Sequence, residues 1–273
     1  MFDVILSNSQ LLLFLFTAGA FAGLIAGMFG VGGGVVIVPA LFFVLSALGY
    51  DDTGMHVAVG TSLATIIATS VRSVLAHNKK GAVDWNVLKA WVPFIVLGSL
   101  ASSLLSGFIS GEALTAFFGV VAILLSAQFI FGRPGWKMAD ELPDGVVKAS
   151  IGGIIGACSA LMGIGGGVFG VTLMTLCGRP IHQAVGTAAG FGAAIGVPGA
   201  IGFIASGWAH EDLPPMSVGY LSLPGFIIIA LLTTLIAPLG ASLAHKLPAH
   251  RLKQAFGILM LLTAFNMLRK VWF

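Results

Sequence analysis

The chain has 273 residues, of which 58% are hydrophobic and 8% are charged. Soluble domains carry about 25% charged residues, so this composition excludes a water-soluble domain. The 38 glycines and two tyrosines favour closely packed membrane helices over a membrane β-barrel with aromatic girdles, and a net charge of +3 is too small and too scattered to indicate nucleic-acid binding. We therefore expect an all-α polytopic protein in the lipid bilayer.

Ten apolar segments follow one another along the chain, on the basis that a crossing helix needs about 20 mostly apolar residues. In the first half they are expected at 11–29, 34–48, 57–76, 88–109 and 112–131. In the second half they are expected at 146–162, 167–177, 184–205, 217–241 and 251–270. A polar, turn-rich connector at 132–147 separates an N-terminal unit, 1–131, from a C-terminal unit, 148–273.

Two motifs recur in both halves in the same order. The first is a glycine motif, GVGGG at 30–34 and GIGGG at 163–167, with an offset of 133 residues. The second is AVGT at 58–61 and 184–187, with an offset of 126 residues, and a histidine precedes each copy. Matches of this length in the same order predict an internal repeat.

The positions of the positive charges discriminate between two topologies. If each glycine-split stretch is one broken helix, each half has four crossings, and the Lys and Arg residues divide nine against four. If each stretch is two segments, each half has five, and eleven of thirteen fall on one side. Short cytoplasmic loops hold such residues, so we expect two inverted repeats of five segments with both termini outside. Re-entrant hairpins give the same parity, and the short segment 167–177 favours one in the second half.

The two glycine motifs are the predicted substrate-binding site. A helix that starts after such a break points backbone N–H groups and a partial positive charge at its surroundings, which suits an oxyanion. Non-helical backbone is tolerated in a bilayer only where protein buries it or a water-filled cavity meets it. Close helix packing explains a single motif equally well, but explains two copies at matching repeat positions less readily. The candidate residues are Gly32, Gly33, Gly34, Gly165, Gly166 and Gly167.

Polar side chains at and near the second motif are further candidates for contact with an anion. Hydroxyl groups near the start of a helix can donate to a ligand, or they can cap or back-bond the helix itself. Histidines at helix ends are also typical of helix interfaces, and an arginine near a helix end can extend to the membrane surface. The hydroxyl candidates are Thr61, Ser62 and Thr187, and the secondary candidates are His56, His182 and Arg72.

The groups that the segments lack narrow the function further. All ten carboxylates fall in loops or at segment ends, whereas a cation pathway or proton relay places ionisable residues inside the membrane. The sequence has no recognisable catalytic triad, metal cluster or phosphate-binding loop, so we expect no enzyme activity, no cofactor and no metal. An inside-negative potential drives anions outward by about 2.3 kcal/mol per charge per 100 mV, so anion export needs no coupling ion.

The chain resembles the sulfite/sulfonate exporter family, also called TauE/SafE or the toluene-sulfonate uptake permeases. The resemblance rests on GLIAGMFGVGGGVVIVPAL at 23–41, HVAVGTSLATI at 56–66, GIIGACSALMGIGGGVFGV at 153–171 and HQAVGTAAGFGAAIG at 182–196. It implies a permease of the bacterial inner membrane that exports sulfite or organosulfonates such as sulfoacetate. The halves differ at two sites: Pro39 has Thr172 as its counterpart, and Ser62 has Ala188.

The sequence therefore predicts a permease that exports a small sulfur oxyanion or organosulfonate through a midplane site between the glycine turns, by alternating access. Two alternatives stay open. One is a channel-like anion pathway, and the other is a membrane binding or assembly partner that transports nothing. The sequence indicates no particular oligomeric state.

Overall fold

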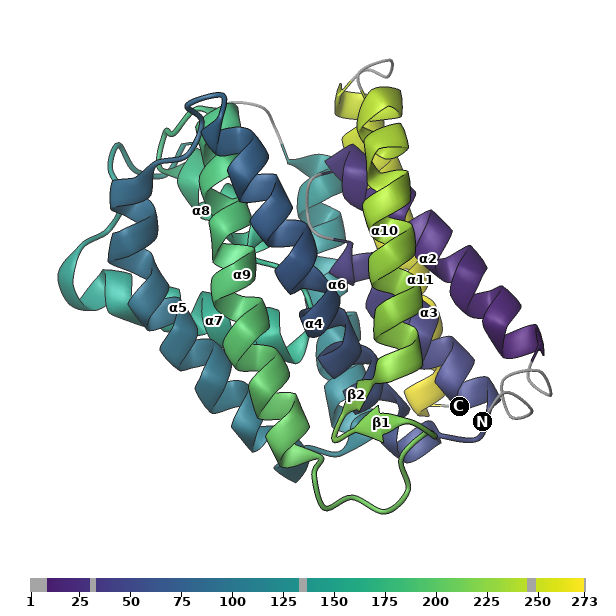
Figure 1. The fold of residues 1–273 in the computed structure, drawn as a ribbon. Coiled ribbons are helices and arrows are strands. Elements are labelled where there is room, and N and C mark those ends of the chain that lie inside the picture. The colour runs from purple at the N-terminus through teal and green to yellow at the C-terminus, as the bar shows by residue number, and fades with distance from the viewer. Residues whose placement is uncertain (1–8, 30–32, 133–136, 245–248, 273) are drawn as a thin grey trace.

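The described residues of the computed structural model, 9–29, 33–132, 137–244 and 249–272, form a bundle of ten α-helices (Figure 1). The expected all-α polytopic fold is confirmed. The first five helices are α2 (Ser9–Phe29), α3 (Gly34–Ala47), α4 (Asp51–Asn78), α5 (Trp85–Leu105) and α6 (Gly111–Phe131). The second five are α7 (Gly145–Leu161), α8 (Gly167–Leu176), α9 (Ile181–Ser206), α10 (Leu223–Ala244) and α11 (Ala249–Trp272).

Short elements occupy two of the turns at one end of the bundle. A 3₁₀ turn, η1 (Ser106–Phe108), extends α5, and a two-stranded hairpin of β1 (Ser217–Val218) and β2 (Leu221–Ser222) leads into α10. The segment expected at 217–241 therefore becomes helical only after this hairpin. Four described helices are long and apolar enough to cross a membrane: α4, α5 together with η1, α6 and α9.

Acidic residues in the sequence determine where two of the helices begin. Asp84 precedes α5, and its carboxylate accepts hydrogen bonds from the backbone N–H groups of Asn86 and Val87, at 3.1 Å each. Asp51 and Asp52 lie in the first turn of α4, where acidic side chains stabilise a helix N-terminus. The helix α4 consequently begins six residues before the segment expected at 57–76.

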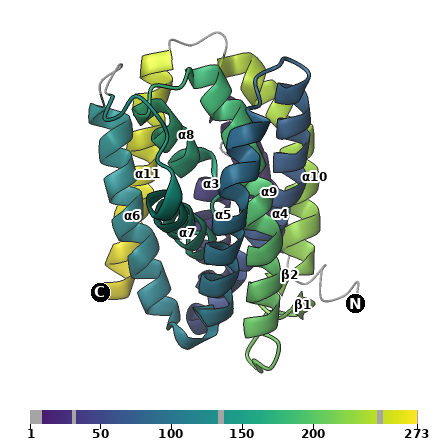
Figure 2. The same ribbon diagram turned by 90° about the vertical axis from the view of Figure 1, so that its left-hand side faces the viewer.

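Helices of one half pack along helices of the other half in a reciprocal pattern (Figures 1 and 2). The first helix of the first half, α2, packs along α10, the fourth helix of the second half. In the same way α7 packs along α5, while α4 packs on α9 and α6 packs on α11. The predicted repeat would relate the α2–α10 pair to the α7–α5 pair. It would also exchange α4 with α9 and α6 with α11, so these two pairs would each map onto themselves.

Pairs of glycines make two of these contacts close. Gly19 and Gly23 of α2 face α10, where a Cβ at Gly23 would lie 2.9 Å from Cα of Thr233. Gly152 and Gly156 of α7 face α5, and a Cβ at Gly156 would overlap a backbone carbonyl there. The two pairs have the same four-residue spacing and lie 133 residues apart, the offset of the glycine motif. The predicted repeat would therefore include these helix contacts, which the motif comparison did not reveal.

The helices α7 and α8 form a hairpin that returns to the side from which it enters. The backbone N–H of Met138, in the connector before α7, donates to the carbonyl of Leu176 at the end of α8, at 2.8 Å. The helices α2 and α3 likewise begin and end at the end of the bundle where α11 finishes (Figure 1). The ten residues of α8 and the fourteen of α3 are too few to cross about 30 Å of hydrocarbon, so neither pair crosses the bundle twice.

The two ends of the bundle differ in the number of basic residues in their turns. We call the end with Ser9, Asp51 and Trp272 the terminal end, and the end with Asn78 and Ile181 the connector end (Figure 1). Turns at the connector end carry the basic residues Lys79, Lys80, Lys137 and Arg179, together with the acidic residues Asp84, Asp140, Glu141 and Asp144. Turns and helix starts at the terminal end carry Asp51, Asp52, Glu112, Glu211 and Asp212.

Candidate functional site

The two glycine turns meet near the middle of the bundle. Gly34 begins α3, and a Cβ there would overlap the carbonyl oxygen of Gly163. The hydroxyl of Ser62, near the middle of α4, donates a hydrogen bond to the same carbonyl at 2.7 Å. Gly34, Ser62 and Gly163 are buried. Glycine is needed at position 34 because the backbones of the two halves touch there.

The start of α8, which follows Gly163 closely in the sequence, carries buried backbone N–H groups. Among the residues that the structure describes, no hydrogen-bond acceptor is found for the N–H groups of Gly165, Gly166 and Gly167. All three glycines are buried. The first N–H groups of a helix lack partners inside the helix, and together with the helix dipole they favour an anion. The predicted candidate Gly32 lies outside the described residues.

The two turns have different backbone conformations. Gly33, which caps α3, has a φ of 78°, in the left-handed region. Its repeat counterpart Gly166, which caps α8, has a φ of −59°. A Cβ at Gly166 would overlap Cβ of Phe191 on α9, so this glycine also serves helix packing. The site is therefore asymmetric, as the difference between Ser62 and its counterpart Ala188 indicated.

The threonines of the AVGT motifs bind backbone groups of the opposite half. The Thr61 hydroxyl accepts a hydrogen bond from the N–H of Ser222 just before α10, and the Thr187 hydroxyl accepts one from the N–H of Asp84 just before α5, both at 2.9 Å. A Cβ on the preceding glycine would overlap a carbonyl oxygen of the same connecting segment in each case. Each AVGT motif thus docks the fourth helix of the other half.

The secondary candidates lie apart from one another. His56 is buried in α4 near the terminal end, where its Nε2 lies 3.1 Å from the carbonyl of Ser106. Its repeat counterpart His182 is exposed at the start of α9, and Arg72 is exposed on α4 toward the connector end. In the described part of the chain, no three His, Cys, Asp or Glu side chains are placed to hold a metal ion.

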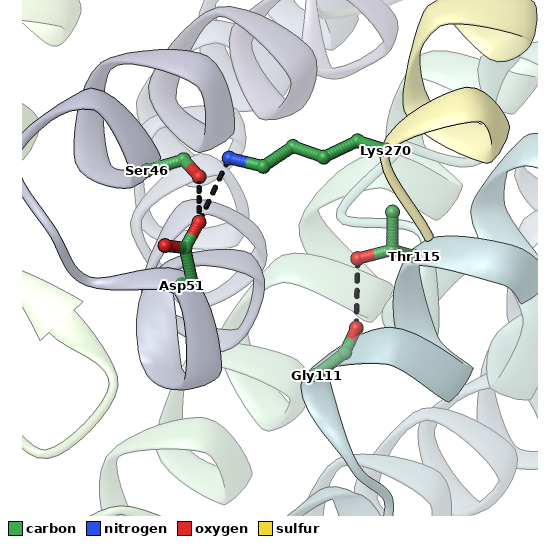
Figure 3. Close-up of polar contacts among 5 residues, drawn as sticks. All are labelled: Ser46, Asp51, Gly111, Thr115 and Lys270. Atoms are coloured by element: carbon green, nitrogen blue, oxygen red, sulfur yellow. Dashed lines mark hydrogen bonds and ion pairs between the residues drawn. The ribbon is translucent and has the colours of Figure 1, made fainter. Parts of the chain in front are cut away.

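A polar cluster at the terminal end ties the last helix to the α3–α4 turn (Figure 3). Asp51 accepts a hydrogen bond from Ser46 and forms an ion pair with Lys270 of α11 at 2.8 Å. The Lys270 ammonium also lies 5.4 Å from the ring centre of Phe42. On the neighbouring α6, Thr115 donates to the carbonyl of Gly111 (Figure 3). A cavity of about 440 Å³ opens beside the cluster, lined by Phe43, Asn266, Arg269 and Lys270.

Replacing Asp51 with asparagine is expected to lower the free energy of unfolding by at most about 1 kcal/mol, because the ion pair is exposed to solvent. Thermal unfolding of the purified protein measures the change. Asp52→Asn, which removes the same charge one residue away, is the matched control. A loss several times larger for Asp51→Asn alone would show that the cluster holds the bundle together.

Comparison with known proteins agrees with this architecture. The profile of the family described as Sulfite exporter TauE/SafE matches residues 15–267. A probable membrane transporter protein of Haemophilus influenzae is 35% identical over 254 residues, which cover 92% of this chain and 96% of the relative. A probable membrane transporter protein of Methanocaldococcus jannaschii is 27% identical over 242 residues, covering 88% and 89%. No solved structure matches this chain significantly. The chain is therefore a membrane transporter that belongs to the sulfite exporter TauE/SafE family.

Proposed function

We propose that the protein exports sulfite or small organosulfonates such as sulfoacetate across the bacterial inner membrane. The observation that carries the proposal is the row of buried N–H groups of Gly165, Gly166 and Gly167 at the start of α8, for which the described residues supply no acceptor. An oxyanion with several acceptor oxygens can satisfy such a row. The family description supports a sulfur oxyanion as the substrate.

Alternating access of two inverted halves is the mechanism that we propose. The reciprocal contacts of α2 with α10 and of α7 with α5 support a two-fold relation between the halves. Because each re-entrant hairpin packs on a helix of the opposite half, the moving units combine elements of both halves. The anion would sit at the contact of Gly34 with Gly163, and separation of the turns would open the site.

The orientation follows from the charges. The connector end carries most of the lysines and arginines of the described turns. By the positive-inside rule the connector end faces the cytoplasm, which places both termini outside. In this orientation an inside-negative potential drives anions outward.

Flux of labelled sulfite, sulfoacetate and methanesulfonate into and out of proteoliposomes tests the proposal, with acetate as a matched carboxylate. We expect saturable flux of at least one sulfur anion, with counterflow and a dependence on the imposed potential. Absence of flux from folded protein would overturn the substrate assignment. Flux that does not saturate and shows no counterflow would replace alternating access with a channel.

A further inference from the structure

His56 stands out among the ionisable residues. Of the acidic and basic side chains whose burial the structure describes, His56 alone is buried, with 4% of its surface exposed. Its repeat counterpart, His182, is exposed. The buried imidazole therefore belongs to one end of the transporter only, and the glycine site described above does not use it.

Acceptor oxygens surround the His56 ring. Its Nε2 lies 3.1 Å from the carbonyl of Ser106 and 3.0 Å from that of Ile109, so Nε2 carries a hydrogen and donates to both. Its Nδ1 is buried and has no hydrogen-bond partner among the described residues. The carbonyl of Asp52, one helical turn earlier, is a third oxygen that interacts with the ring.

An aromatic face completes the surroundings. The ring of Tyr220, in the hairpin before α10, stacks on the imidazole with centroids 4.6 Å apart and an interplanar angle of 29°. Burial raises the pKa of the Tyr220 phenol, so this neighbour is neutral. His210, whose ring centroid lies 5.8 Å from that of Tyr220, is the one titratable side chain that acts electrostatically on His56 in the described part of the chain. A charge on His210 would oppose a charge on His56.

Burial of the ring opposes a charge on it, whereas the carbonyl oxygens around it favour one. In the neutral ring the lone pair of Nδ1 is buried without a donor, which carries a desolvation cost. In the protonated ring both nitrogens donate, and the Asp52 carbonyl can serve as the second acceptor. Hydrogen bonds from a charged donor are about twice as strong as neutral ones, and an aromatic face attracts a cation.

We propose that His56 is the proton-binding residue that controls the rate of anion transport. The inference rests on the proposed function, since it assigns a regulator to the same transport cycle. His56 joins α4 to the α5–α6 corner and to the hairpin before α10, and Thr61 joins the same helix and hairpin through Ser222. Protonation strengthens these contacts and holds the hairpin on α4. It therefore slows the movement of the helices that alternating access requires. Flux therefore rises with pH as His56 loses its proton.

The test is methanesulfonate flux in proteoliposomes between pH 5 and 8, with equal pH on both sides. Methanesulfonate keeps its charge over this range, whereas sulfite does not. We expect wild-type flux to rise about tenfold across the range in a single titration, the range in which histidine changes charge. His56→Gln, which retains a donor for the two carbonyls, should give a flat profile, and His182→Gln should keep the wild-type profile. A flat wild-type profile, or an unchanged profile in His56→Gln, would overturn the proposal.

Nitrogen-15 NMR of labelled histidine measures proton binding separately from transport. Replacing the other five histidines with glutamine leaves His56 as the single signal. The ring nitrogens should shift from the neutral to the charged form as pH falls from 8 to 5, and a ring that stays neutral would overturn the proposal. If the ring titrates but no anion is transported, the proposed function fails and the proton site stands. If flux is observed and the ring stays neutral, the proton site alone fails.

Discussion

Replacing Gly34 with alanine is expected to reduce anion flux below about a tenth of the wild-type rate. A Cβ at this position overlaps the carbonyl oxygen of Gly163 and lies 3.0 Å from Cα of Ile164. Backbone atoms cannot rotate away as a side chain can, so the two turns must separate. Overpacking of this kind costs about 1–3 kcal/mol, and it displaces the carbonyl that Ser62 binds. Initial rates of sulfite or methanesulfonate flux in proteoliposomes measure the effect.

Gly153→Ala is the matched control for this change. The substitution is the same, and it lies in α7, the helix that leads to the second glycine turn, but a Cβ at Gly153 meets no atom within 4 Å. Alanine also favours a helix over glycine by about 1 kcal/mol. We therefore expect wild-type flux and an equal or higher melting temperature. Wild-type flux in Gly34→Ala would show that contact between the turns plays no part in transport.

The order of the helices could be read from hydropathy, because each apolar segment is a local property of the chain. The segments expected at 112–131 and 167–177 appear as α6 (Gly111–Phe131) and α8 (Gly167–Leu176). The charge count favoured ten segments over eight because the positions of the Lys and Arg residues between the segments are also a local property of the chain. It could not decide between full crossings and re-entrant hairpins, which place the same loops on the same sides. The ten-residue length of α8, which is too short to cross about 30 Å of hydrocarbon, makes that distinction for α7 and α8.

Contacts between distant residues could not be read from the sequence. Thr61 and Ser222 are separated by 161 positions, and no sequence pattern at either position identifies the other as its hydrogen-bond partner. The sequence comparison therefore identified AVGT as a repeated motif without identifying what it binds. The glycine pair of α2 was hidden for a similar reason, since its spacing gains meaning only when α10 is known to lie against it. The sequence did contain one signal for this pair: it lies 133 residues before the glycine pair of α7, the same offset as that between the two glycine motifs.

Replacing Thr61 and Thr187 with valine is expected to destabilise the bundle from both halves at once. Valine keeps the shape of threonine but leaves the N–H groups of Ser222 and Asp84 without their acceptors, at a cost of about 1–3 kcal/mol each. The Ser222 N–H is buried and the Asp84 N–H only partly so. Thr61→Val should therefore have the larger effect, and the double variant should lose about the sum because the two contacts share no partner.

Thermal unfolding in detergent and resistance to proteolysis measure the two losses. Thr61→Ser and Thr187→Ser keep the accepting oxygen and should retain most of the wild-type stability, which separates the hydrogen bond from general packing. If the valine and serine variants are equally stable at each position, the hydroxyls do not hold the halves together. If Thr187→Val is more damaging than Thr61→Val, burial of the N–H group does not set the cost. Equal losses of stability in Thr61→Val and Thr187→Val would instead indicate that the membrane excludes water from the Asp84 N–H as completely as the bundle excludes it from the Ser222 N–H.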